Sequence, residues 1–228
     1  MKVKITSIAV LLLFLITPLS IFAQKTVLNE DFSPAPNLHK SYGDWEVKNG
    51  RLYQKDTQKG LAMLNFNAEQ SGVMQYEFTL RYEAGGIEDL MGGFGIHIFV
   101  DEADHGRSWG DGDSYLLWIN YDQKATYGGK GFRAQVYDSD STTEMVLKAG
   151  YSLAPYSKYL SKENLNNEIP IKIVANSYTG DINVYDPSNP DWYYYFTLPN
   201  LSDRGNFIGF RTNSLSISID NLKVTKLR

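Results

Sequence analysis

The stretch Gly72-Val-Met-Gln-Tyr-Glu-Phe-Thr-Leu-Arg-Tyr82 alternates between apolar and polar residues. Every second position carries a large apolar or aromatic side chain: Met74, Tyr76, Phe78, Leu80 and Tyr82. Successive side chains of a β-strand point to opposite faces of a sheet. The alternation therefore predicts a strand with one face in a core and the other in water.

Short segments of this kind, separated by turn residues, continue along the chain. Asn49-Gly50, between Trp45–Lys48 and Arg51–Gln54, is a strong signal for a two-residue β-hairpin. The chain is 14% aromatic and has 19 glycines, a composition that favours pleated strands and turns. Only Pro155–Leu165 is expected to form a helical turn. The other predicted strands are Thr26–Phe32, Leu61–Phe66, Gly92–Asp101, Ser114–Tyr121, Phe132–Tyr137, Glu144–Lys148, Ile169–Asn176, Asp181–Tyr185, Trp192–Leu198, Asn206–Arg211 and Leu215–Leu227.

The spacing of these segments predicts the fold class and the number of domains. A dozen or more strands at regular intervals predict an all-β sandwich or barrel. No repeat of 20–50 residues and no linker rich in Pro, Gly or Ser divides the chain. We therefore expect one β-sandwich domain over residues 24–228.

The first residues have the features of a secretory signal peptide. Lys2 and Lys4 precede the apolar run Ile8–Phe22, and Ala23 is a small residue before Gln24. Residues 1–23 are therefore expected to be removed on export. The run is short for a bilayer span, and no other apolar stretch is long enough, so we expect no stable membrane insertion.

Charge and cysteine content exclude several classes of function. The net charge of −4 becomes −6 once the two lysines of the signal segment are removed, which argues against a nucleic-acid partner. The absence of cysteine excludes disulfides, thiolate catalysis and a lipid-modified cysteine. Together with the signal peptide, this predicts a bacterial protein released into the periplasm or the medium.

Several motifs stand in a characteristic order along the chain. They are Leu28-Asn-Glu-Asp-Phe-Ser33, Trp45-Glu-Val-Lys-Asn-Gly-Arg-Leu-Tyr53, Asp113–Tyr121, the pair Ile169–Val174 and Asp181–Tyr185, and the pair Ile208–Arg211 and Ile219–Val224. This order resembles the concanavalin A-like lectin/glucanase superfamily, especially its laminin-G-like and bacterial sugar-hydrolase-related branches. The resemblance implies an antiparallel jelly roll of two curved sheets, with a carbohydrate site on the concave sheet.

Candidate catalytic acids are few. Glycosidases usually need two carboxyl groups about 5–9.5 Å apart. The acids two residues apart lie beside Gly or Ser in expected loops: Glu102 and Asp104, Asp111 and Asp113, Asp138 and Asp140. Where the sugar-hydrolase-related branch has glutamate after its tyrosine, this chain has Leu116 after Tyr115. A non-catalytic carbohydrate-binding protein is therefore favoured. A glycoside hydrolase with an unrecognised acid pair and a structural protein of the cell envelope stay open as alternatives.

The strand Tyr115–Tyr121 offers a sugar-binding face. If Leu117 and Ile119 point inward, Trp118 and Asn120 point outward, and an outward indole provides a plane on which a sugar ring can stack. A tryptophan covered by a neighbouring segment is the competing interpretation. The partner expected for this face is a polysaccharide or glycan. Further candidate ligand contacts on the polar faces of other strands are His97, Arg133, Gln135, Tyr137, Glu77 and Arg81.

A structural calcium ion is the one cofactor expected. Carboxylate oxygens are the ligands that calcium prefers, although no EF-hand loop is present. The first and last strands of such sandwiches often pair, which would bring Glu30 or Asp31 close to Asp220. In jelly rolls of the resembled kind, a calcium ion near this place is structural. The sequence leaves the oligomeric state open.

Overall fold

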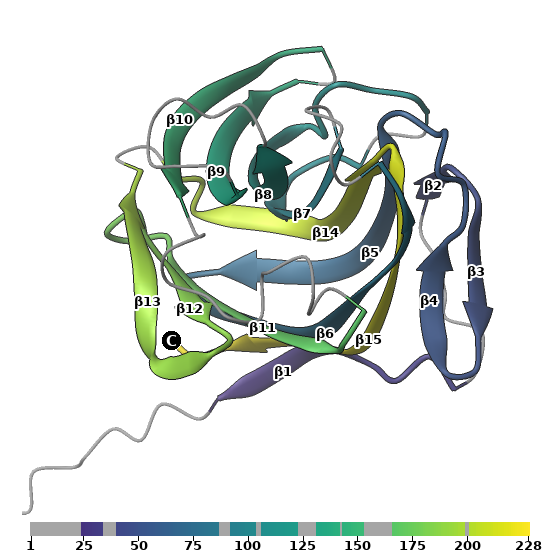
Figure 1. Cartoon of the computed structure of the whole chain (residues 1–228). Helices are drawn as coiled ribbons and strands as arrows, with labels where there is room; N and C mark the ends of the chain where they lie inside the picture. Colours follow the sequence, from purple (N-terminus) through teal and green to yellow (C-terminus); the bar gives the residue numbers. More distant parts are fainter. Residues whose placement is uncertain are drawn as a thin grey trace, which may run out of the picture.

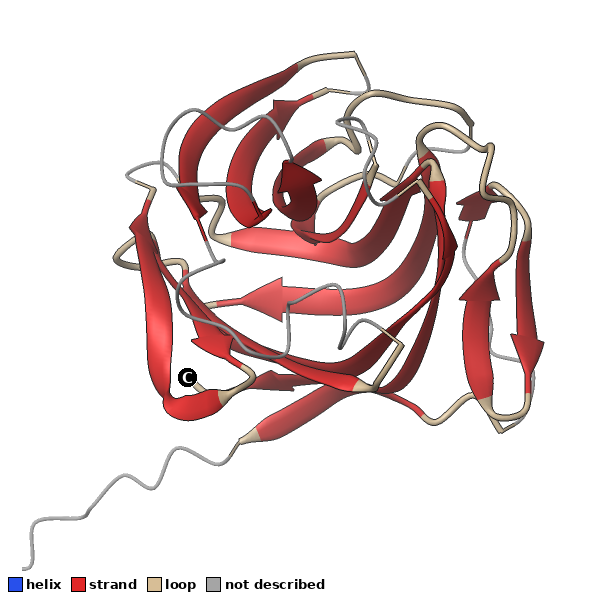
Figure 2. Cartoon of the chain, viewed as in Figure 1, coloured by secondary structure: helices blue, strands red, loops and turns tan. Residues whose placement is uncertain are grey.

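The computed structural model describes residues 24–33, 40–86, 92–103, 106–122, 131–141, 143–152, 166–198 and 201–228. Within these ranges every regular element is a β-strand (Figure 2). The signal segment 1–23 and the expected helical turn Pro155–Leu165 both lie outside the described residues. No helix of the described part is long and apolar enough to cross a membrane.

Two antiparallel sheets, which we name A and B, form the described structure (Figure 1). Sheet A contains β1 (Lys25–Glu30), β3 (Trp45–Lys48), β4 (Arg51–Gln54), β6 (Val73–Gly85), β11 (Ile169–Asn176), β12 (Asp181–Asp186), β13 (Asn189–Thr197) and β15 (Leu215–Lys226). Sheet B contains β2 (Lys40–Tyr42), β5 (Ala62–Ser71), β7 (Gly93–Val100), β8 (Asp113–Asp122), β9 (Gly131–Asp140), β10 (Met145–Ser152) and β14 (Arg204–Asn213). The order is β13-β12-β11-β6-β15-β4-β3 in sheet A, with β1 beside β15, and β10-β9-β8-β7-β14-β5-β2 in sheet B. The predicted all-β, two-sheet sandwich is confirmed.

The alternating segment that predicts a strand forms β6, which lies between β11 and β15 in sheet A. Its apolar side chains Met74, Tyr76, Phe78 and Leu80 are buried between the sheets. Phe78 meets Phe210 of sheet B edge to face, with ring centroids 5.0 Å apart. This contact joins the two inner faces in one hydrophobic core.

The chain ends and the first hairpin also follow the sequence signals. Asn49 and Gly50 have φ values of 53° and 72°, the left-handed conformation that a tight hairpin turn needs. They connect β3 to β4, whose residues pair from Trp45 with Gln54 onward. β1 pairs with β15, so the first and last strands are neighbours, as expected.

Candidate functional site

The outer face of sheet B is hollowed by a groove of about 220 Å³. Strands β8, β9 and β14 provide its floor, and the segment between β7 and β8 contributes Trp109 to its wall. Its lining residues are Leu61, Trp109, Leu116, Trp118, Asn120, Gln135, Tyr137, Met145, Arg211 and Asn213. This lining contains two indoles, one phenol and three side-chain amides but no carboxylate.

Two glycines of β7 determine where the Trp118 indole lies. In the β7–β8 register Gly95 is opposite Trp118, and Gly93 is opposite Asn120. A Cβ atom at Gly93 would be 2.4 Å from Trp118 Cζ2, and one at Gly95 would be 3.0 Å from Cε3. The six-membered ring therefore occupies the space that both glycines leave open. Trp118 is half-buried, which combines an anchored ring with an accessible surface.

The wall that carries Trp109 is fixed from below by a buried arginine. Arg211 of β14 is 2% exposed, and its guanidinium donates hydrogen bonds to the backbone carbonyls of Ser108 and Trp109. The backbone N–H of Asp111, in the same segment, donates to Ser139 Oγ of β9 at 3.0 Å. Trp109 itself remains 42% exposed. These contacts hold an exposed indole beside the groove at little entropic cost on binding.

Four of the eight predicted ligand contacts line this groove: Trp118, Asn120, Gln135 and Tyr137. The β8–β9 register brings them together, because Gln135 is opposite Trp118 and Tyr137 is opposite Leu116. The Tyr137 hydroxyl donates to Gln135 Oε1 at 3.3 Å, and burial raises the pKa of Tyr137. The Oδ1 atom of Asn120 is buried without a hydrogen-bond partner in the described structure.

His97 is on β7 but does not reach the groove surface. The side chain is fully buried, and its Nδ1 lies 3.0 Å from Ser114 Oγ. Burial, together with the nearby charge of Arg211, lowers the pKa of His97 well below its usual value. Ile96 and Ile98 belong to the core, so His97 lies on the outer face as expected, but it is covered and the prediction of an accessible ligand contact is wrong. The segment after β7 folds back over sheet B, and strand alternation alone does not reveal such a cover.

Arg133 and two residues of β6 are the other candidates outside the groove lining. Arg133 is opposite Asn120 on β9 and is half-buried. Glu77 and Arg81 are on β6, in sheet A, where the Arg81 Nε atom lies 2.8 Å from Glu83 Oε1. Placing Glu77 and Arg81 on the same face as Trp118 was wrong, because a strand's own pattern does not reveal which sheet it joins.

Trp109 and Arg211 are parts of the site that were not predicted from the sequence. Trp109 lies within Gly106-Arg-Ser-Trp-Gly-Asp-Gly112, and a large aromatic residue in such a polar, glycine-rich segment is a usable signal for a binding loop. Arg211 gives no comparable signal, because it ends a short apolar segment like many surface arginines.

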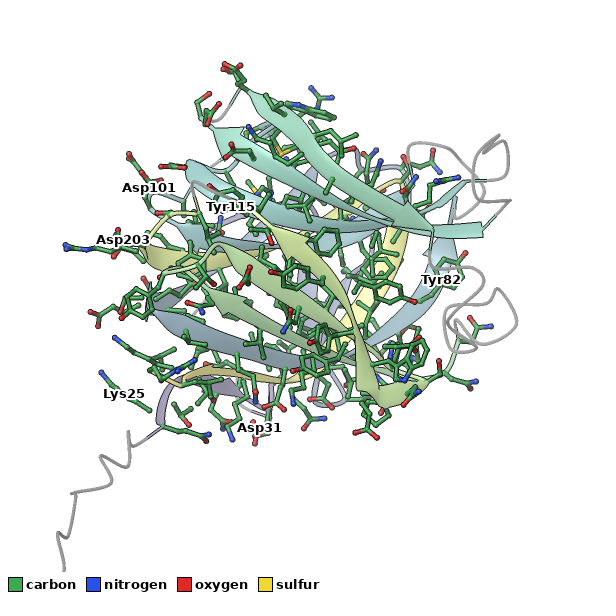
Figure 3. The ribbon with its side chains drawn as sticks, turned by 90° about the vertical axis from the view of Figure 1, so that its left-hand side faces the viewer. Lys25, Asp31, Tyr82, Asp101, Tyr115 and Asp203 are labelled. Carbon is green, nitrogen blue, oxygen red and sulfur yellow. The ribbon has the colours of Figure 1, made fainter. Side chains whose placement is uncertain are left out.

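The residues predicted for calcium do not form a convergent carboxylate set. Glu30 is opposite Leu222, and Asp31 accepts two hydrogen bonds from Ser33. Asp220 Oδ2 lies 3.5 Å from the Arg51 guanidinium. Asp31 follows β1 and lies well away from Asp101 (Figure 3). Among the described residues no group of three or more His, Asp or Glu can hold a metal ion. Calcium remains a prediction that these contacts do not favour.

Comparisons with known proteins place the fold. No protein-family profile matches the chain, and no curated protein matches it by sequence. Carbohydrate-binding module CBM66 from Bacillus subtilis is similar in structure at 12% identity, with a TM-score of 0.52 over 89% of this chain and 95% of that one. The CBM2 module of the evolved Dit protein of Lactobacillus casei BL23 phage J-1 gives 0.58 at 9% identity, over 89% and 95%.

A lectin is also similar in structure. Lectin I from Ulex europaeus, solved with the methyl glycoside of α-L-fucose, has a TM-score of 0.54 at 10% identity, over 89% of this chain and 97% of the lectin. The chain thus has the two-sheet jelly-roll fold of lectins and carbohydrate-binding modules. The predicted concanavalin A-like resemblance is confirmed at the level of the fold.

Proposed function

We propose that this protein is a non-catalytic carbohydrate-binding protein that holds a glycan in the groove of sheet B. The observation that carries the proposal is the Trp118 indole, which lies across Gly93 and Gly95 with Asn120 and Gln135 beside it. Pyranose rings have apolar C–H faces that stack on aromatic planes and hydroxyl groups that need planar donors and acceptors. The groove offers both in one place.

The second indole strengthens this assignment. Trp109 enters the groove from the segment held by Arg211, so an aromatic wall adjoins the Trp118 floor. A concave site lined by apolar and aromatic residues with a few polar groups is the usual form of a small-ligand site. The structural neighbours include two carbohydrate-binding modules and a lectin solved with a fucoside, which supports a glycan as the ligand.

The proposed place of action is outside the cytoplasm, in the periplasm or the medium. The basic start, the apolar run and the small residue before Gln24 support export with removal of residues 1–23. N-terminal sequencing of exported protein should find Gln24 or a close neighbour as the first residue. Exported material that still begins with Met1 would contradict this part of the proposal.

A glycan array with the mature protein, followed by calorimetric titration of the best oligosaccharide, tests the binding function. Trp118→Ala should abolish binding, whereas the wild-type protein binds one oligosaccharide per chain in the groove. Trp192→Ala is the matched control, because Trp192 is 64% exposed and lies on β13 of the other sheet. Binding that survives Trp118→Ala, in a variant with a normal far-ultraviolet spectrum, would overturn the groove as the site.

A further inference from the structure

The outer face of sheet A carries a row of tyrosines at its β13 edge. Tyr193 and Tyr195 are each 51% exposed, and they share a face because they are two residues apart on a strand. Tyr193 pairs with Tyr185 of β12, and their ring centroids are 5.4 Å apart at an interplanar angle of 52°. β12 and β13 form the edge of the sandwich that faces the viewer in Figure 3.

A hydrogen bond to Asp181 holds the Tyr195 ring in place before any ligand arrives. The Tyr195 hydroxyl donates to Asp181 Oδ1 at 2.6 Å, and Thr197 Oγ1 donates to the same oxygen at 3.1 Å. Thr179 Oγ1 donates to Oδ2 at 2.6 Å. These three donors lower the pKa of Asp181, which therefore remains an acceptor for them at neutral pH. An exposed tyrosine that is already oriented loses little conformational entropy on contact with a ligand.

A groove adjoins the tyrosine row on the side of β11. Its volume is about 380 Å³, and Tyr185 belongs to its lining. The ammonium of Lys172 lies 4.6 Å from the Tyr185 ring centroid. The rest of the lining combines polar and apolar side chains. The polar ones are Glu77, Thr79, Lys172, Asp186 and Asn221, and the apolar ones are Phe78, Ile171, Pro170, Pro187 and Pro190. Aromatic planes and hydrogen-bonding groups therefore lie side by side on this face as well.

The composition of the face favours a glycan over a protein partner. The outward positions of β12 and β13 are Asp181, Asn183, Tyr185, Tyr193, Tyr195 and Thr197, and none is aliphatic. The core of a protein–protein interface is depleted of Asp, Glu and Lys, whereas this face places them among its aromatic rings. Tyrosines that alternate with carboxylate, hydroxyl and ammonium groups match the C–H faces and hydroxyl rims of successive sugar units.

We propose a second glycan-binding face, which we name the tyrosine face. It consists of Tyr185, Tyr193 and Tyr195 and of the adjoining groove that Lys172 and Glu77 line. It takes an extended polysaccharide chain laid over β11, β12 and β13. This face goes beyond the proposed groove function and lies on the opposite outer surface of the sandwich, so a short oligosaccharide in the first groove does not occupy it. A long polymer can engage both, and linked contacts raise the apparent affinity.

Affinity electrophoresis in gels that contain laminarin, xylan, galactomannan or polygalacturonate tests the second face. The mature wild-type protein is compared with Tyr193→Ala/Tyr195→Ala, with Trp118→Ala and with the triple variant. We expect the double variant Tyr193→Ala/Tyr195→Ala to be retarded by the polymer in the gel at least tenfold less than the wild-type protein. Its affinity for the array oligosaccharide should stay unchanged. Trp118→Ala should keep residual retardation, which the triple variant loses.

Two further variants serve as a control and as a replacement for the double variant. Tyr178→Ala is the control, because Tyr178 is a more exposed tyrosine in the turn between β11 and β12 and should leave retardation unchanged. Tyr193→Ser, which spares the Asp181 hydrogen bonds, replaces the pair if the double variant melts early. A folded tyrosine variant that migrates like wild type would overturn the second face, as would wild-type protein that no polymer retards. If a tyrosine variant has an altered sedimentation coefficient but wild-type retardation, the tyrosines mediate self-association and do not bind a glycan. If the tyrosine variants lose retardation as expected but Trp118→Ala still binds the oligosaccharide fully, only the proposed groove function is overturned.

Discussion

The two outer faces of this sandwich present their aromatic residues in different ways. On sheet B, the segment between β7 and β8 folds back, so that His97 and Arg211 are buried beneath it together with the segment's own Asp111. What remains accessible is a groove with Trp118 at its base. On sheet A, no segment of the described structure buries Tyr193 or Tyr195, which stay half-exposed on bare strands. Strand alternation alone makes a flat platform, and a folded-back loop makes a pocket.

This difference predicts different ligands and different tolerance to mutation. A pocket encloses a short glycan and depends on buried supports, so distant changes beneath it affect binding. A platform contacts one side of a polymer and depends on a few exposed rings, so their removal costs binding but little stability. The substitutions below either separate the two faces along these lines or show that the distinction is wrong.

Trp118→Ala is expected to have the largest effect on the comparison. It removes the aromatic plane of the groove, which should lower affinity for the array oligosaccharide at least about 30-fold, as for a binding hot spot. Because the indole is half-buried against Gly93 and Gly95, unfolding should also become easier by about 1–2 kcal/mol, less than for a fully buried aromatic residue. Calorimetric titration and a thermal melt measure both quantities. A stability loss of about 3–5 kcal/mol would make Trp118 a core residue instead.

Gly95→Ala should rank second. Its Cβ would lie 2.4 Å from the Leu117 carbonyl oxygen and 3.0 Å from Trp118 Cε3, so both the strand and the indole must move. We expect a stability loss of about 1–3 kcal/mol together with weaker oligosaccharide binding. Gly150→Ala on β10 is the control, since its nearest contact would be 3.7 Å, an ordinary van der Waals distance. Equal melting temperatures for the two variants would refute the packing of Trp118 on β7.

Arg211→Lys tests the support of the loop. A lysine cannot span the carbonyls of Ser108 and Trp109 as the guanidinium does. Oligosaccharide affinity should fall about three- to tenfold, and stability should fall by about 1–3 kcal/mol because buried carbonyls lose donors. Retardation by polymer through the tyrosine face should persist. Isothermal titration and gel retardation separate the two results, and a variant with unaltered oligosaccharide affinity would remove Arg211 from the site.

The parts of the fold that depend on local rules were predictable from the sequence. The alternation of β6 and the Asn49-Gly50 turn are confirmed. The outward direction of Trp118 and Gln135 also follows from residues two apart sharing a face. These features need only near neighbours in the chain or a regular strand, and a period of two is enough to place them.

Three features of the site could not be read in this way. The sheet to which β6 belongs decides where Glu77 and Arg81 lie, and long-range pairing sets that choice. Regular alternation from the core residues Ile96 and Ile98 would place Phe99 outward, but Phe99 has a φ of 55° beside a register shift and is buried in the core. An irregularity of this kind reverses the alternation beyond it. The path of a loop depends on contacts such as those of Arg211, which no local pattern encodes.

The smallest expected effect is the pH dependence that buried His97 gives to sheet B. Burial and the charge of Arg211 lower the pKa of His97 in the folded protein, whereas an unfolded histidine titrates near about 6.5. Below that pH the unfolded chain takes up a proton that the folded protein refuses, so stability falls as the pH decreases. The slope from this one residue is at most about 1.4 kcal/mol per pH unit.

Denaturant titrations at several pH values between 7.5 and 5 should show this loss for the wild-type protein, and His97→Gln should reduce the slope. The glutamine keeps a polar group near Ser114 but cannot titrate. Because His97 lies on the groove side of sheet B, beneath the segment that carries Trp109, oligosaccharide binding should weaken with acid before retention by the tyrosine face does. The tyrosine face relies on Asp181, whose lowered pKa keeps it ionised over this range. If stability depends on pH with the same slope in His97→Gln and in the wild-type protein, His97 does not cause the pH dependence. If acid weakens binding at both faces in parallel, the distinction between pocket and platform is wrong.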